Sequence, residues 1–175
     1  MTLEEKIRED LRQYLTGQQA IDAKMPECPD VEEAWAKVGE DYLPDGIREF
    51  AAYPTVSLGW MMFVGMAMAY LWDTDWEHWQ HEPHPYTVLR DKRGFDHTDD
   101  YIMDELLRMD AAQHGATSRL VSECAHRTYA LLRHEALAPG SAEAFRGYIA
   151  CLRQLYLMGM AVQLHRMGYH MTLMG

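Results

Sequence analysis

The sequence predicts an all-α protein, a single-domain helical bundle of about four main helices around a central, nearly all-apolar helix, with short extra helices. Three observations predict this class. Segment 55–72, TVSLGWMMFVGMAMAYLW, carries no charge. Elsewhere apolar residues recur at the spacing of three and four that is typical of one-faced helices. No segment has the apolar and polar alternation that is typical of strands.

Length and composition fit one domain over residues 1–175. A chain of 175 residues can bury a substantial core without disulfide or metal support. Its 48% hydrophobic and 25% charged residues are ordinary for a globular protein. Thirteen methionines indicate a methionine-rich core, in which this flexible side chain fills irregular gaps.

The first predicted helix begins at Thr2, since Glu5 three residues later completes a capping-box pattern. The apolar residues that follow keep a helical spacing: Leu3, Ile7, Leu11, Tyr14, Leu15, Ile21 and Met25. Because proline interrupts a helix, we expect Pro26 and Pro29 to end it.

A short helix over 31–38, capped by Asp30, is expected next. The segment 39–53 contains Pro44 and Gly46, which favour turns with at most one helical turn.

The central helix is expected over 55–79, beginning near Pro54, because proline suits the first turn of a helix. Its apolar part is nearly long enough to cross a bilayer. However, no Lys or Arg flanks it closely, and Asp73 and Asp75 follow at once. We therefore expect a helix buried by other helices and no membrane association.

After the central helix, segment 83–97 is predicted to be an ordered surface loop. Helical spacing then resumes and keeps its phase over 98–136, which favours one long helix, with two helices split near Gly115 as the alternative. Ser141 is predicted to cap a final helix that is nearly as apolar as the central one.

Charge and cysteine content exclude several classes of function. A formal net charge of -11, without any cluster of Lys and Arg, disfavours nucleic acid and anionic membrane surfaces as partners.

The three cysteines, Cys28, Cys124 and Cys151, form no C-x-x-C pair, and the charged N-terminus lacks the features of a secretory signal. These features predict a cytoplasmic protein. Phosphate-binding loops and hydrolase motifs are absent from the sequence.

Six potential metal ligands lie directly after the apolar run: Asp75, Glu77, His78, His81, Glu82 and His84. On a continuing helix, His78 and His81 share one face and Asp75 lies one turn earlier, which gives a set suited to a divalent transition metal. The alternative is a solvated polar turn whose histidines face water.

Other metal arrangements need residues from elsewhere in the chain. Further ligands for the first cluster would have to come from His97, Asp110 or His114 across the bundle. Glu123-x-x-His126 has the spacing found in di-iron bundles, but a single copy cannot supply the ligand set of such a centre.

A ligand pocket is predicted from polar residues on the long helix. With 100° per residue and Leu120 as zero, Glu123, Arg127 and His134 fall within the apolar stripe. Glu123 and Arg127 would then form an inward ion pair with a structural role. The alternative is that this pair lines a pocket, where Arg127 orients an anionic or carbonyl-bearing ligand. Trp72 and Trp76 are aromatic candidates for such a ligand site.

Three functions follow from these patterns. The leading hypothesis is a non-enzymatic interaction or structural module that acts as a homodimer, because two nearly all-apolar helices exceed what one core of this size easily covers. The second is a metal-binding or metalloenzyme bundle that uses Asp75, His78 and His81. The third is a small-ligand sensor with a pocket at Glu123 and Arg127.

Overall fold

The structure, a computed structural model, describes residues 1–24 and 28–169. These residues form helices and no strands, which confirms the predicted all-α class. The helices differ from the prediction in number and in several boundaries, and these differences determine where a site can lie.

Helix α1 (Leu3–Gly17) begins as predicted, because the Thr2 side chain accepts a hydrogen bond from the backbone N–H of Glu5 at 3.2 Å. The helix buries its apolar face on the other helices. It ends at Gly17, earlier than the prolines suggested. Met25 and Pro26 lie outside the described residues.

Two helices follow, α2 (Pro29–Glu33) and α3 (Trp35–Ala52). The prediction of turns over 39–53 is wrong, since α3 continues through Pro44. A proline inside a helix costs about 3 kcal/mol. Burial of Val38 and Tyr42 against the rest of the protein offsets that cost.

Helix α4 (Pro54–Trp79) confirms the predicted central helix. It bends at Asp75, whose φ of -153° and ψ of 49° are not helical. The hydroxyl of Thr74, next to this bend, donates to the backbone carbonyl of Tyr70 at 2.9 Å. A threonine that bonds to the carbonyl four residues earlier slightly destabilises a helix and often bends it. The final turn, Trp76 to Trp79, therefore leaves the line of the main helix.

The predicted loop over 83–97 is mostly helical, since it contains α5 (Pro85–Asp91) and the 3₁₀ helix η1 (Phe95–His97). Both alternatives for 98–136 are also wrong. The chain forms α6 (Thr98–Asp100), a π-helix η2 (Tyr101–Leu106) and, after a break, α7 (Ala111–His134).

The break before α7 has a local cause. Arg108 adopts a left-handed conformation with φ of 53°. Asp110 then caps α7 by accepting from the N–H of Gln113 at 2.8 Å, while the Gln113 side chain accepts from the N–H of Asp110 at 3.0 Å. No break occurs at Gly115, which lies inside α7.

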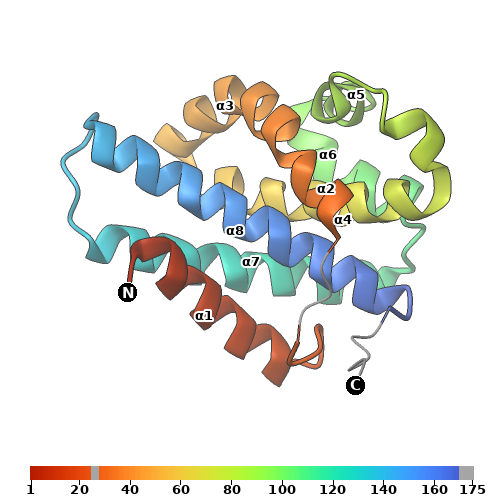
Figure 1. Cartoon of the computed structure of the whole chain (residues 1–175), viewed down its shortest axis with the longest axis horizontal. Coiled ribbons are helices and arrows are strands. Elements are labelled where there is room, and N and C mark those ends of the chain that lie inside the picture. Colours follow the sequence, from red (N-terminus) through yellow and green to blue (C-terminus); the bar gives the residue numbers. More distant parts are fainter. Residues whose placement is uncertain (25–27, 170–175) are drawn as a thin grey trace.

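Helix α8 (Ala142–Arg166) begins at its predicted cap, Ser141, which accepts from the N–H of Ala144 at 3.1 Å. Figure 1 shows α8 crossing the molecule between α3 on one side and α1 and α7 on the other. Its most extensive contact is with α4. Gly65 of α4 and Gly159 of α8 allow this close approach, because their α-carbons face the backbone of the other helix.

The two apolar helices are covered mainly by the rest of the same chain. Within the described residues, α4 is the helix long and apolar enough to cross a membrane, and 72% of its most apolar 18-residue window is buried inside the protein. Core helices of soluble proteins pass the same test. Most residues of α8 from Tyr148 to Leu164 are buried as well. This burial removes the surplus of apolar surface on which the homodimer prediction rested, and the homodimer itself stays a prediction.

Candidate functional site

A pocket of about 550 Å³ lies where α3, the end of α7 and the start of α8 meet. We call it the α7–α8 pocket. Its lining consists of Ile47, Phe50, Tyr129, Leu132, Arg133, Ala136, Leu137, Pro139, Gly140, Ser141, Ala144, Phe145 and Tyr148. Most of these side chains are apolar, and the volume is within the range of pockets that hold small molecules.

The inner wall of the α7–α8 pocket is fixed by buried hydrogen bonds. The Tyr148 hydroxyl lies 2.6 Å from Oγ of Ser57, which donates to the carbonyl oxygen of Gly46 at 2.8 Å. Burial raises the pKa of Tyr148 well above its usual range, so the group remains a neutral phenol. Phe50 packs edge-on against both Tyr129 and Tyr148, which holds the aromatic walls in place.

The mouth of the pocket carries exposed apolar groups and one cation. Ile47 and Phe145 are 49% and 48% exposed, which is unusual for large apolar side chains. The guanidinium of Arg133 lies 5.6 Å from the centre of the Tyr129 ring. In residues 1–24 and 28–169, no carboxylate lies within 4.0 Å of Arg133. The cation is therefore available to a ligand.

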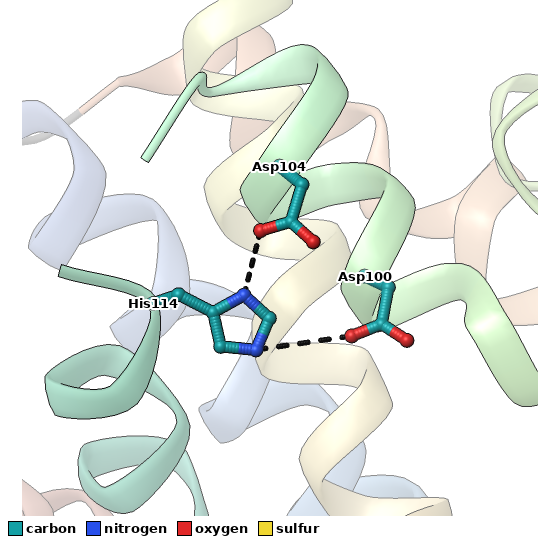
Figure 2. Close-up of side chains that lie close together, drawn as sticks. All are labelled: Asp100, Asp104 and His114. Carbon is teal, nitrogen blue, oxygen red and sulfur yellow. Dashed lines mark hydrogen bonds and ion pairs between the residues drawn. The ribbon is translucent and has the colours of Figure 1, made fainter. Parts of the chain in front are cut away.

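A second group of polar side chains joins α6 and η2 to α7. Figure 2 shows the imidazole of His114 between the carboxylates of Asp100 and Asp104. Nδ1 of His114 lies 2.6 Å from Oδ1 of Asp104, and Nε2 lies 3.8 Å from Oδ1 of Asp100. One potential ligand atom from each residue lies within 4.8 Å of the others, and among the described residues this is the group of three that could hold a metal ion.

The electrostatics of this group favour a positive charge between the two carboxylates. The hydrogen bond that Nδ1 of His114 donates to Asp104 raises the pKa of His114, and the charges of Asp104, Asp100 and Asp99 act in the same direction. Burial raises the pKa of Asp99, one oxygen of which has no hydrogen-bond partner among the described residues. An imidazolium or a divalent cation would balance these acids.

Comparison with protein-family models, curated proteins and solved structures finds no match to this chain. The fold class alone does not identify a function, because one fold supports many. A functional assignment therefore depends on the chemistry of the residues themselves.

The residues predicted to bind a metal do not converge in the structure. Asp75, His78 and His81 are all exposed. Asp75 lies at the bend of α4, so the continuous helix assumed for these ligands is interrupted. His78 packs edge-on against Trp79, with ring centres 5.4 Å apart. Of the suggested additional ligands, His114 lies in the three-residue group of Figure 2.

Glu123 and Arg127 form the predicted ion pair, at 3.0 Å, but the pair is not inward. Their side chains are 47% and 38% exposed. Arg127 also contacts Asp10 at 3.4 Å and lies over the Tyr14 ring, so it joins α7 to α1 on the surface. These residues line neither of the two pockets described here.

The three remaining candidates lie apart. His134 is the exposed last residue of α7. The indole N–H of Trp72 donates to Asp30 at 3.3 Å. Trp76 lines a smaller pocket beside α2 and α3.

Sequence reasoning missed the α7–α8 pocket, and of the second group it named only His114. The pocket residues are mainly apolar and come from three helices, so their spacing carries no signal of a site. Asp100 and Asp104 are four residues apart, and that spacing of two acids was the available signal for the second group.

Proposed function

We propose that the protein binds a small apolar molecule bearing one carboxylate group, and that the α7–α8 pocket is its binding site. One observation carries the proposal: a pocket of about 550 Å³, open to solvent, whose walls are mostly apolar side chains. The sequence analysis also predicted a small-ligand site, but at Glu123 and Arg127, whereas the pocket proposed here contains Arg133.

The position of Arg133 supports the choice of a ligand with an oxygen-bearing group. The chain carries a net charge of -11, so an anion gains little from its overall field. A local cation without a carboxylate partner among the described residues can supply the attraction. The apolar walls would cover the body of the ligand while Arg133 holds its polar end at the mouth.

The proposal is tested with two probes of similar size, octanoate and neutral 2-octanone, titrated into the protein by calorimetry. We expect dissociation constants on the order of 100 µM for the wild type. Arg133→Gln should weaken octanoate binding about fivefold and leave 2-octanone binding unchanged, because only octanoate is charged. Ala144→Phe places a ring in the pocket and should weaken binding of both probes.

Arg146→Gln is the matched control, because Arg146 lies on α8, pairs with Glu143 at the surface and does not line the pocket. It should leave both affinities unchanged. Unaltered binding of both probes to a folded Ala144→Phe variant would exclude this pocket. An equal loss of octanoate affinity in the two arginine variants would exclude a specific role for Arg133.

A second candidate function is the binding of a divalent transition metal by Asp100, Asp104 and His114. The closeness of their ligand atoms, within 4.8 Å of one another, supports it. Imidazole nitrogen and carboxylate oxygen are suitable ligands for zinc and for other divalent first-row transition metals. The two ring nitrogens of His114 face different carboxylates, so the ring or one carboxylate would have to turn for all three residues to bind one ion.

Tag-free protein titrated with Zn²⁺ by calorimetry at pH 7.5 tests this candidate. Binding should weaken as the pH falls, because the ion competes with a proton on His114. His114→Ala should abolish the heat of binding, whereas His126→Ala on the same helix should not. The candidate is rejected if 1 mM Zn²⁺ gives no saturable heat or if both variants behave alike.

A further inference from the structure

A second pocket, of about 280 Å³, lies beside the last turn of α4, between that turn and the segment of α2 and α3. We call it the Trp76–Trp79 pocket. The two tryptophans line it together with three acidic residues, Asp30, Glu33 and Glu82, and one basic residue, Lys37. Its size corresponds to a molecule of a few heavy atoms.

Within the described part of the chain, the acids in this pocket lack cationic partners. Asp30 accepts from the indole N–H of Trp72 at 3.3 Å, and Glu82 accepts from the backbone N–H of His84 at 3.1 Å. Over the part of the chain that the structure describes, none of Asp30, Glu33 and Glu82 lies within 4.0 Å of a basic group. Three carboxylates against one ammonium leave the pocket negatively charged.

The aromatic lining of the pocket also favours a positive ligand. Tryptophan is the aromatic side chain that attracts organic cations most strongly, through the negative potential of its ring. The pocket also includes Gln80, the C-cap of α4, but its backbone carbonyl oxygen already accepts from the ammonium of Lys37 at 3.5 Å. The carboxylates and the indoles act in the same direction on a bound charge.

We propose that the Trp76–Trp79 pocket binds a small organic cation of the alkylammonium class. The two indoles would contact the alkyl groups while the surrounding carboxylates balance the charge. An inorganic cation fits less well, because it would interact with the carboxylate oxygens alone, whereas an alkylammonium ion would also be attracted by the indole rings.

Tetramethylammonium chloride is the probe, and the indole N–H signals of the five tryptophans in a ¹H–¹⁵N NMR spectrum give the readout. At constant ionic strength, with NaCl as the reference, the signals of Trp76 and Trp79 should shift with saturation on the order of 1 mM. Those of Trp35 and Trp60 should stay in place. The tert-butyl group of 3,3-dimethyl-1-butanol is a neutral isostere of a trimethylammonium group, and this alcohol should produce shifts that do not saturate.

Three charged side chains that are exposed or partly exposed can be replaced without disturbing the core. Removing a negative charge and removing a positive charge should change the affinity for tetramethylammonium in opposite directions. Glu82→Gln should weaken tetramethylammonium binding about threefold, and Lys37→Gln should strengthen it by a similar factor. Glu77→Gln is the control, because Glu77 is an exposed acid on the same turn of α4 that does not line the pocket. It should leave the affinity unchanged.

The proposal is overturned by an absence of saturable shifts in Trp76 and Trp79. It is also overturned if Glu77→Gln weakens binding as much as Glu82→Gln, since the attraction would then come from the overall acidity of the chain. Equal shifts with the neutral isostere would show that charge is not recognised.

Discussion

Replacement of Gly65 by Ala should destabilise the protein strongly, although alanine is the better helix former. Gly65 lies where α4 meets α8, and a methyl group there would lie 2.9 Å from the carbonyl carbon of Tyr156 and closer still to its oxygen. These are backbone atoms of another helix, so a change of side-chain rotamer cannot make room. The two longest helices would have to separate locally.

The size of the effect follows from two opposing contributions. Ordinary contacts between carbon atoms are about 3.5–4.0 Å, so the helices must separate by on the order of 1 Å at this point. Overpacking of a core costs about 1–3 kcal/mol and more where backbone must move, whereas Gly to Ala in a helix gains about 1 kcal/mol. Because backbone atoms must move here, we take the overpacking cost as about 4 kcal/mol, which leaves a net loss of about 3 kcal/mol, or about 10 °C in Tm.

Urea unfolding followed by circular dichroism measures this loss, with Gly115→Ala as the matched control. A methyl at Gly115 would lie 3.3 Å from the guanidinium of Arg119, the far end of a flexible side chain. That variant should gain about 0.5–1 kcal/mol from helix propensity alone. If Gly65→Ala unfolds within 0.5 kcal/mol of the wild type at the same m-value, the close approach of α4 and α8 is wrong.

Three further predictions concern buried and paired polar groups. Ser57→Ala should lower the free energy of unfolding by about 2 kcal/mol in urea, because the Tyr148 hydroxyl and a buried carbonyl lose their partner; an unchanged midpoint would contradict this. Asp104→Asn should lower the pKa of His114 toward its ordinary value in an NMR titration. Because the pKa of His114 is raised in the folded protein, the stabilisation by its ion pair with Asp104 is complete below about pH 6.5 and is lost as the pH rises through the raised pKa. If His114 has the same pKa in Asp104→Asn as in the wild type, the ion pair is excluded. Burial raises the pKa of Cys124 to about 12, so a thiol reagent at pH 8 should label it only after unfolding; rapid labelling of the folded protein would refute its burial.

The helix starts that depend on neighbouring residues were predictable from the sequence. Thr2 and Ser141 each satisfy free N–H groups within the next three residues, so their effect needs no distant contact. The central helix was predictable for a different reason. An uncharged run of this length has no face that can meet water, and its burial follows from composition.

Helix α3 was not predictable, because its residues favour turns and distant contacts overrule them. Tyr42 donates to the carbonyl oxygen of Ser57 at 2.5 Å. Asp45 accepts from Tyr86 at 2.7 Å and pairs with Arg90 at 3.1 Å. These partners lie in α4 and α5, so local sequence around Pro44 contains no sign of them.

The misplaced pocket came from a misplaced helix face. Apolar spacing continues across the break before α7 by coincidence, so the predicted apolar stripe, with Leu120 as its zero, lies on the wrong face of the helix. The buried residues of α7 are Thr117, Val121, Cys124, Ala125 and Thr128. At 100° per residue their centre lies about 80° from Leu120, which turns Glu123 and Arg127 toward the surface. The pattern Asp110-x-x-Gln113 was the available signal for the true helix start.

Both proposed pockets depend on the same helix. Lys37 lies near the start of α3 and lines the Trp76–Trp79 pocket, whereas Ile47 and Phe50 lie near its end and line the α7–α8 pocket. The buried hydrogen bonds of Tyr42 and Asp45 lie between them.

An internal proline lowers the intrinsic propensity of α3 to be helical, so the helix depends on tertiary contacts. The same contacts determine how α3 is rotated about its axis. Apolar contacts tolerate sliding and rotation, whereas directional hydrogen bonds to buried partners do not. Loss of those bonds in a rotated α3 would leave a buried carboxylate without partners, which is costly. The polar contacts at the middle of α3 therefore fix the walls at both of its ends. Ligands at either pocket would meet a preformed surface and lose little affinity to reorganisation of the protein.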